Sequence, residues 1–246
     1  MKKFKIKIYM LGYQRYKHEI DKLKNYSSKL FEVTEWLSIE QLPSSNSLNM
    51  WGYSDNQLTQ ILKTNNIDNS NVDLCMCFID SPIECNYFSR ELPGIDEKTV
   101  VCSFSGVEDI LNSEDIEFFN FLHEAILYRV VLVAAFHTVN ENHLTHDDTR
   151  NCLFDMCGMK KDIALKCSAP HLCPECKSKI GKKAMDPRFL PSLEKEFTSF
   201  KKPLFNRILD FVKRRPIVSI LITIVSSIIF NLLSSLLYDL IKAFFV

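Results

Sequence analysis

Five of the nine cysteines in this 246-residue chain lie within residues 149–180, and four of those five form two close pairs. Four residues separate Cys152 from Cys157, and two residues separate Cys173 from Cys176. Close pairs of thiolates are typical ligands of tetrahedral Zn²⁺. Because four protein ligands leave no position open for water, the spacing predicts a structural zinc site and not a catalytic one.

Other residues around the two pairs are expected to support or replace these ligands. Cys167 and His171 are possible substitute ligands, and the alternative that the first pair are plain buried thiols stays open. Arg150 and Asp155 flank the first pair and are expected to orient the thiolates through hydrogen bonds or an ion pair. The remaining cysteines lie in or near predicted strands and are expected to pack as apolar side chains: Cys75, Cys77, Cys85 and Cys102.

The cysteine spacing resembles that of the archaemetzincins, a branch of the zinc peptidases. Those proteins carry a zinc-binding helix, H-E-x-x-H-x-x-G-x-x-H, followed directly by C-x4-C and later by C-x2-C. This chain has Cys152-x4-Cys157 and then Cys173-Pro174-Glu175-Cys176. The resemblance covers residues 1–180 and implies a metzincin-like α/β domain that binds one structural zinc ion.

The catalytic residues that the resemblance implies are not found at the matching positions. Asn151 stands where the third histidine is expected. The H-E-x-x-H residues would fall at positions occupied by Glu141, Asn142 and Thr145. Because a metallopeptidase needs its metal ligands and a general base, we expect the structural zinc to be kept and the catalytic zinc to be lost.

A different metal site is possible between the long helix and the cysteines. His137, His143 and His146 lie within ten residues of one another, and the last two have a spacing that a loop can present to a metal. These three histidines are the candidate catalytic residues of an alternative function, a membrane-anchored zinc metallopeptidase with an atypical ligand set.

Hydrophobic periodicity predicts an α/β fold. Strands are expected over residues 4–11, 31–37, 72–80 and 98–107. Helices are expected over residues 17–30, 55–64 and 113–139, with Ser54 as the N-cap of the second helix. The order of these elements predicts a mixed sheet with packed helices, followed by the zinc knuckle of residues 149–180 as a C-terminal subdomain.

The C-terminal region has the composition of a membrane anchor. Residues 217–238 are 22 residues without a formal charge, enough to cross a hydrocarbon core of ~30 Å as a helix. We therefore expect residues 1–180 to form the soluble domain, residues 181–215 a linker with a basic amphipathic juxtamembrane segment, and residues 216–246 a transmembrane helix. Residues 199–215 carry a net charge of +5, which predicts contact with the lipid bilayer and a soluble domain on the cytoplasmic side.

One side of the predicted membrane helix is polar. At 100° per residue, small polar residues fall within about half of the helix circumference: Ser219, Thr223, Ser227, Asn231 and Ser234. Small polar residues let helices approach closely in lipid, and an asparagine in a span usually faces a partner. This stripe predicts self-association, with a conducting pore as a narrower alternative.

Bulk composition excludes several functions. The formal net charge is zero and no phosphate-binding glycine loop occurs, so we expect neither a nucleic-acid partner nor a common nucleotide-binding enzyme. The odd number of cysteines fits a reducing compartment. The layout predicts a non-catalytic, zinc-stabilised sensor or interaction domain that receives a protein or small-molecule signal and acts as a bacterial stress or anti-phage membrane effector. A scaffold that recruits a partner to the membrane is a further alternative.

Overall fold

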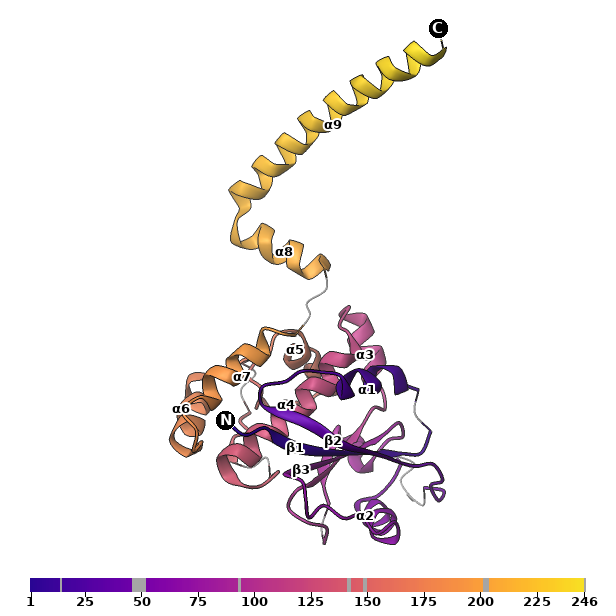
Figure 1. Ribbon diagram of the computed structural model, residues 1–246, viewed down its shortest axis with the longest axis vertical. Coiled ribbons are helices and arrows are strands. Elements are labelled where there is room, and N and C mark those ends of the chain that lie inside the picture. Colours follow the sequence, from indigo (N-terminus) through magenta and orange to yellow (C-terminus); the bar gives the residue numbers. More distant parts are fainter. Residues whose placement is uncertain are drawn as a thin grey trace. The chain divides into compact units, whose positions relative to one another are not determined.

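The computed structural model describes residues 1–13, 15–45, 52–92, 94–140, 143–147, 150–200 and 204–245. Contacts divide the chain into two compact units, Met1–Lys201 and Lys202–Val246, and each is described by itself (Figure 1). Glu141 and Asn142, two of the positions compared with the zinc-binding helix motif, lie outside the described residues.

Unit 1 is built on a five-stranded sheet with the strand order β2-β1-β3-β5-β4. The strands are β1 (Phe4–Leu11), β2 (Phe31–Ile39), β3 (Leu74–Ile79), β4 (Ser89–Glu91) and β5 (Thr99–Ser103). The strands pair in parallel except β4, which is antiparallel to β5 at one edge. The mixed sheet with packed helices confirms the predicted fold class. The short strand β4 was not predicted, because three polar residues carry no hydrophobic periodicity.

Helices pack on both faces of this sheet, and several more follow its last strand in the chain. Those of unit 1 are α1 (Lys17–Lys24), α2 (Asp55–Thr64), α3 (Val107–Ser113), α4 (Phe118–Phe136), α5 (Ile163–Ser168), α6 (Pro174–Lys183) and α7 (Phe189–Phe197). Unit 2 contains α8 (Leu204–Arg214) and α9 (Pro216–Phe245). As predicted, Ser54 caps α2, and its side chain accepts a hydrogen bond from Gln57 N in a capping box.

Strand β3 lies between the two layers of the core, because successive side chains point to opposite faces of the sheet. Leu74, Met76 and Phe78 belong to the cluster formed with α1, α3 and α4. Cys75 and Cys77 belong to the smaller cluster formed with α2. These two cysteines are fully buried among apolar side chains, as expected, whereas Cys85, for which the same packing was expected, is exposed.

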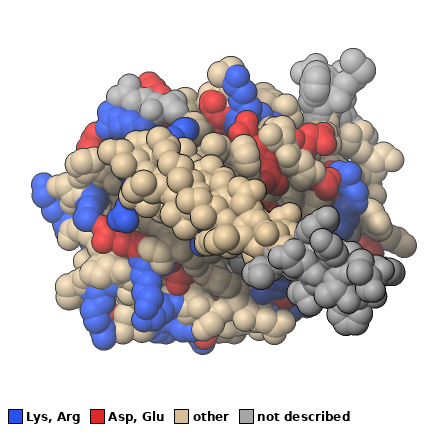
Figure 2. All heavy atoms as spheres, turned by 90° about the horizontal axis from the view of Figure 1, so that it is seen from above, with Lys and Arg blue, Asp and Glu red and all other residues tan. Residues whose placement is uncertain are grey.

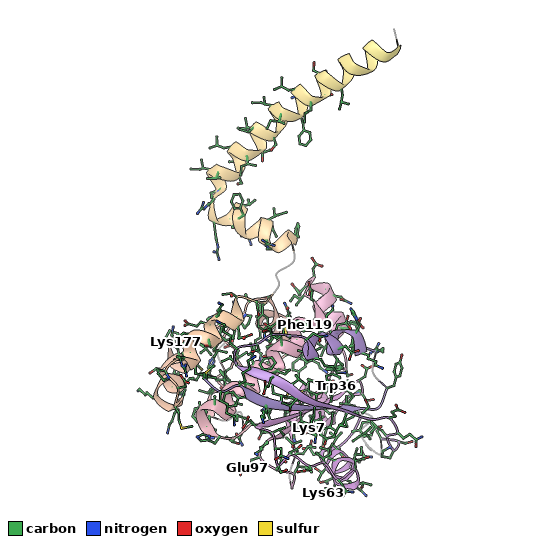
Figure 3. All side chains as sticks on the ribbon, in the orientation of Figure 1. Lys7, Trp36, Lys63, Glu97, Phe119 and Lys177 are labelled. Carbon is green, nitrogen blue, oxygen red and sulfur yellow. The ribbon has the colours of Figure 1, made fainter. Side chains whose placement is uncertain are left out.

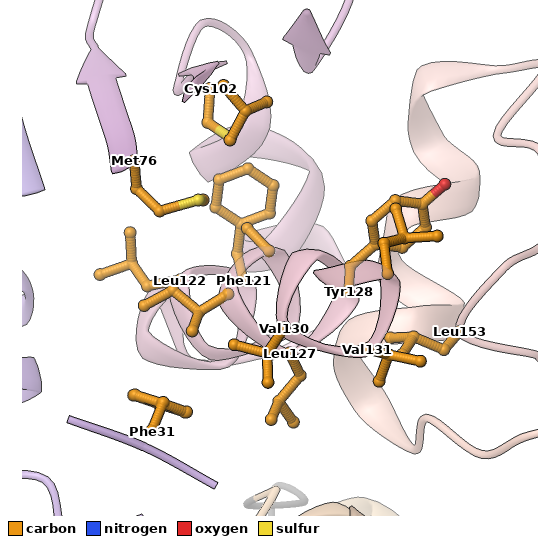
Figure 4. Close-up of a cluster of buried hydrophobic side chains, with 14 of the residues drawn as sticks. Phe31, Met76, Cys102, Phe121, Leu122, Leu127, Tyr128, Val130, Val131 and Leu153 are labelled. Carbon is orange, nitrogen blue, oxygen red and sulfur yellow. The ribbon is translucent and has the colours of Figure 1, made fainter. Parts of the chain in front are cut away.

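Helix α4 is the central element of unit 1 and is buried on nearly all sides. Figure 4 shows Phe121 directed toward Met76 and Cys102, whereas Val131 lies beside Leu153 of the C-terminal segment. Helix α4 therefore joins the sheet to the region that carries the cysteines.

The helix predicted over residues 113–139 begins only at Phe118 in the structure, and the separate helix α3, which was not predicted, precedes it. Helix α3 ends at Ser113 and α4 begins at Phe118. Between them Asp115 has a left-handed φ of 55°, and Ile116 N donates to Leu111 O at 2.8 Å. This hydrogen bond satisfies a carbonyl at the end of α3 and terminates that helix. Residues 114–117 of the predicted helix therefore form the connection between α3 and α4.

Residues 181–200 fold onto unit 1, although the sequence predicted a linker from residue 181. Helix α7 buries Phe189 in the core. Glu196 of α7 accepts hydrogen bonds from Ser28 Oγ and Lys29 N, both at 2.8 Å, and from Tyr26 OH at 3.0 Å. Unit 1 consequently extends to Lys201.

His123 of α4 completes this attachment. Its Nε2 lies 3.3 Å from Glu196 Oε2, and its ring stacks on Phe200 with the centroids 4.7 Å apart. Burial opposes ionisation of Glu196, but the adjacent His123 ring and hydrogen bonds from Lys29 N and Ser28 outweigh burial and lower the pKa of this carboxyl to about 2. The charged carboxylate therefore stabilises the folded state.

We expect Glu196→Gln to lower the free energy of unfolding by about 1–3 kcal/mol at neutral pH, because buried donors lose a charged acceptor. The pKa of Glu196 is lower in the folded state than the ~4.3 of an unfolded chain. Its contribution is therefore present above the unfolded value and is lost as the pH falls toward 2. Urea unfolding of parent and variant should show a difference that shrinks below about pH 4. Glu194→Gln, at an exposed position of the same helix, is the control. An equal loss of unfolding free energy at neutral pH and below pH 4 would contradict a lowered pKa for Glu196.

Unit 2 contains the candidate membrane helix. Two helices among the described residues are long and apolar enough to cross a membrane, α4 and residues Pro216–Ser235 of α9. The apolar window of α4 is 78% buried inside unit 1, whereas that of α9 is not buried at all. Apolar side chains project from α9 on every side in Figure 3, and in Figure 2 α9 forms a tan band without blue or red spheres. Helix α9 is thus the candidate span.

Candidate zinc centre

Four side chains of unit 1 converge on one point. Their ligand atoms all lie within 4.8 Å of one another, and the residues are His146, Cys152, Cys173 and Cys176. Tetrahedral Zn²⁺ with Zn–S bonds of about 2.3 Å needs ligand atoms about 3.8 Å apart. Small rotations of these side chains are enough to reach that spacing, so the donor set could bind zinc. The three cysteines are buried and His146 is half-buried.

Backbone pairing holds the first two ligands in place. His146 N donates to Phe154 O at 3.2 Å, and Leu153 N donates to His171 O at 2.8 Å. Isolated β-bridges accompany these bonds, one between His146 and Asp155 and one between Cys152 and His171. His171 therefore contributes its backbone to the site, while its side chain is exposed.

The last two ligands lie at the start of α6. Cys173 is the N-cap of this helix, and its Sγ accepts a hydrogen bond from Cys176 N at 3.5 Å. Pro174 occupies the first turn, where a missing N–H costs nothing. The first turn of α6 therefore brings the sulfurs of Cys173 and Cys176 into the same cluster.

Cys152 has surroundings that favour its thiolate. The neighbouring Cys176 thiol, followed by the N–H groups of Cys173 and Phe154, lowers the pKa of Cys152 below that of an ordinary thiol. Cys173 N lies 3.4 Å from Cys152 Sγ. Because zinc binds thiolates and not thiols, this environment suits a metal ligand.

Asp155 supports the ligands from outside the cluster. Its Oδ2 accepts hydrogen bonds from Arg150 N at 2.8 Å and from Cys152 N at 2.9 Å. Its Oδ1 lies 3.4 Å from His146 Nδ1. The other ring nitrogen of His146, Nε2, then faces the cluster, 3.6 Å from Cys173 Sγ. A carboxylate behind a histidine fixes the ring orientation that metal binding needs.

Cys157 is not part of this group, although the sequence predicted it as the fourth ligand. Its Sγ lies 4.0 Å from Asp155 O, and the side chain is half-buried. Burial raises the pKa of this thiol, and Lys166 only partly offsets the effect. Two residues after Asp155 the chain has already turned away from the cluster, so His146 takes the place assigned to Cys157.

The structure does not bring together the three histidines of the alternative catalytic site. His146 lies in the cysteine cluster. The ring of His143 stacks on Phe136, with the centroids 4.7 Å apart. His137 is the exposed, left-handed C-cap of α4. Within the described ranges, the His/Cys3 cluster is the one group of three or more potential ligands close enough to hold a metal. Cys167, the other possible substitute ligand, is buried outside this group.

A pocket of about 620 Å³ adjoins the centre, and Asp155 and Cys157 belong to its wall. Strand β4, helices α4 and α5, Cys102 of β5 and residues of the adjoining loops form the rest of it. At one side Glu124 Oε1 lies 3.5 Å from Lys166 Nζ, with both side chains buried. No described histidine lines this pocket.

Arg129 holds the walls of the pocket together. This guanidinium is 2% exposed and donates to Ser89 Oγ at 2.8 Å and to Glu91 Oε1 at 3.1 Å. It also donates to Val139 O, just beyond the end of α4. Strand β4 is therefore fixed to α4 through a buried charge, which gives the pocket a defined shape.

The fold and the centre together define a mixed α/β domain with a candidate zinc site made of three cysteines and one histidine. Neither a protein-family model nor a curated protein matches the chain. Solved structures similar to this chain include an archaemetzincin from Methanopyrus kandleri, with a TM-score of 0.48, 15% identity, and coverage of 74% of this chain and 95% of that one.

Two further structures are similar to a comparable part of the chain. An archaemetzincin from Archaeoglobus fulgidus, complexed with malonate, has a TM-score of 0.44 and 20% identity over 71% of this chain and 99% of that one. A zinc-dependent peptidase from Methanocorpusculum labreanum has a TM-score of 0.44 and 9% identity over the same shares. Archaemetzincins are the proteins that the cysteine spacing resembles.

Proposed function

We propose that this protein is a membrane-anchored, zinc-stabilised sensor or interaction domain without peptidase activity. The observation that carries the proposal is the composition of the metal cluster, three cysteines and one histidine. Four protein ligands fill a tetrahedral shell and leave no position for a catalytic water. Zinc bound there would cross-link the start of α6 to the segments that carry His146 and Cys152, which is a structural role.

The pocket beside the centre is the proposed site for a small-molecule signal. It is lined in part by α4, α5 and β4 and contains a buried pair of opposite charges, Glu124 and Lys166. Largely preformed pockets that combine aromatic walls with a few polar groups are the usual sites of small ligands. Tyr128 and Phe121 supply such walls here.

We further propose that α9 spans a membrane with unit 1 in the cytoplasm. Basic residues directly before the span favour that orientation, and Lys213, Arg214 and Arg215 immediately precede Pro216. Pro216 is tolerated in the first turn of α9, because a backbone N–H at that position has no partner within the helix. In this arrangement a signal received by unit 1 would change the association of α9 in the membrane, as expected of a bacterial stress or anti-phage effector.

The polar stripe of α9 is proposed to mediate self-association. The Thr223 and Ser227 hydroxyls donate to backbone carbonyls one turn earlier, at 3.0 Å each, and Ser219 donates to Pro216 O at 2.7 Å. These hydroxyls are satisfied inside their own helix and need no partner. The amide of Asn231 cannot satisfy all its donors and acceptors in this way, so it has the strongest need for a second helix.

We expect Asn231→Leu, combined with Ser227→Leu, to shift the full-length protein from oligomer toward monomer in detergent. Asn231→Leu removes interhelical hydrogen bonds worth about 0.6–2 kcal/mol, which corresponds to a roughly 3- to 30-fold weaker association. Ser227→Leu adds a bulky side chain that prevents close approach of the helices. Chemical cross-linking and sedimentation in detergent measure the change. Val225→Leu, on the opposite face, is the control and should keep the parent's oligomeric state. Monomers for both parent and variant would rule out the effector role.

A further inference from the structure

Helix α8 carries an apolar face that remains exposed within the described part of unit 2. Phe205 is 64% exposed, Ile208 53% and Val212 41%. A helix of 11 residues is too short to be stable in water by its own hydrogen bonds. Its stability must therefore come from something that covers the apolar face.

The arrangement of residues around α8 is that of a helix lying in an interface. At 100° per residue, Phe205, Ile208 and Val212 fall, together with Leu209, within an arc of about 100°. Arg207 and Arg214 lie on the opposite side of the helix, and Lys213 lies between the two faces. Helices that lie flat on a bilayer have this division, with basic residues on the polar face and large apolar residues on the other.

The position of α8 in the chain places it beside a membrane surface if α9 spans the membrane. Arg215 N still donates to Phe211 O at 2.9 Å, and α9 begins at the next residue, Pro216. Arg214 and Arg215 therefore mark the boundary between hydrocarbon and headgroups. At 1.5 Å per residue, all of α8 lies within about 17 Å of that boundary along the chain.

The positive charge of the segment that contains α8 indicates which partner covers its apolar face. Residues 199–215 carry +5 and residues 1–198 carry −5. An anionic leaflet attracts the first segment and repels the second, so α8 must supply the attraction. The acidic unit 1 is a rival partner by charge alone, but it does not explain why the apolar face directly adjoins an apolar span.

We propose that α8 binds the headgroup region of a negatively charged leaflet, with its apolar face toward the acyl chains and its arginines on lipid phosphates and carboxylates. This inference rests on the proposed anchoring through α9. It adds a second membrane contact that depends on lipid charge, whereas insertion of α9 does not. The amount of anionic lipid would then set how closely the end of unit 1 is held to the membrane surface.

Hydrogen exchange of backbone amides tests this in the full chain, reconstituted in nanodiscs of phosphatidylcholine alone or mixed with phosphatidylserine. We expect α8 amides to exchange at least about tenfold more slowly in the mixed discs, since each cation near an anionic surface adds attraction. The difference should disappear at high salt, which shortens the screening length. Amides of α9 should be protected equally in both discs.

Two charge-reversal variants complete the test. Arg207→Glu with Arg214→Glu should abolish the lipid-dependent protection, whereas Lys182→Glu with Lys183→Glu, the same charge change at exposed positions of α6, should keep it. Equal α8 exchange in the two discs, with α9 protected, overturns the inference and leaves the anchoring intact. Protection of α8 in both discs, together with new protection in unit 1, assigns the face to unit 1 and also overturns it. Unprotected α9 amides would remove the anchoring itself.

Discussion

The Cys173→Ser variant is expected to bind no zinc and to unfold well below the parent chain, whereas Cys157→Ser is expected to keep one zinc ion per chain and the parent's stability. The two residues are equivalent in the sequence pattern but not in the structure. Cys173 Sγ lies in the His/Cys3 cluster, while Cys157 lines the neighbouring pocket. Elemental analysis and thermal unfolding of the purified full chain in mild detergent measure both quantities.

The expected loss follows from what the metal joins. In isolated zinc fingers zinc contributes on the order of 10 kcal/mol, because nothing else holds the fold. Unit 1 has its own core, so we expect about half of that, which corresponds to a fall of about 10–20 °C in Tm for a domain of this size. The segment from His146 to Cys176 contributes Leu153 and Phe154 to the main core, so release of the zinc should loosen the packing around α4.

Substitutions of His146 give the sharpest control. His146→Cys supplies a fourth thiolate and should retain zinc, whereas His146→Ala should weaken binding strongly because one of four ligands is gone. Zinc lost in Cys157→Ser but retained in His146→Ala would contradict the cluster and restore the ligand set expected from sequence spacing. Two zinc ions per parent chain would contradict the single structural site and reopen the peptidase alternative.

The ligand set shows which zinc ligands the spacing of cysteines in the sequence can predict and which it cannot. The C-x2-C pair was readable because two residues fix the distance between the sulfurs on a tight turn. The fourth ligand could not be predicted, because both Cys157 and His146 lie close to Cys152 in the sequence. His146, six residues before Cys152, reaches the cluster through its pairing with Phe154. Backbone pairing between irregular segments leaves no periodic trace, so the sequence pointed to a C-x4-C pair instead.

The fold was predictable where one feature dominated. The continuous apolar run of β3 and the capping box of α2 both mark elements that the structure contains. By contrast, α7 combines exposed charges with a few apolar anchors over nine residues, and a short amphipathic helix of that kind looks like a linker. Its attachment depends on Glu196 and His123, which are separated by more than seventy residues. Long-range polar contacts of this kind cannot be read from local pattern.

Breaking the buried pair of Glu124 and Lys166 is the second change with a large expected effect. Glu124 is 3% exposed and Lys166 7% exposed, and Lys166 Nζ also donates to Leu153 O at 3.4 Å. Removal of one partner leaves the other charge buried without compensation, which costs about 3–5 kcal/mol. We expect losses of this size in Glu124→Leu and in Lys166→Met, measured by urea unfolding of the full chain in mild detergent.

The two single variants should differ in their dependence on pH. Burial raises the pKa of Glu124, and Lys166 only partly offsets this effect. For Lys166, burial lowers the pKa but the charge of Glu124 outweighs burial, so the net shift is upward. Without Lys166, the pKa of Glu124 in the folded state rises further above its unfolded value. Stability of Lys166→Met is then greatest below the unfolded pKa of about 4.3 and falls as the pH rises through the folded pKa.

In Glu124→Leu, Lys166 cannot avoid burying its charge by losing its proton. Neutralising a lysine below its unfolded pKa costs free energy at every acidic and neutral pH. The penalty of Lys166→Met, taken relative to the parent at each pH, should therefore shrink on acidification, whereas that of Glu124→Leu should not. The double variant should lose much less than the sum of the singles, since replacing both charges removes the desolvation cost along with the attraction. Additive losses with parallel pH profiles would mean that the two groups are solvated separately in the pocket. That result would remove the buried pair from the proposed signal site and leave only the pocket's shape to select a ligand.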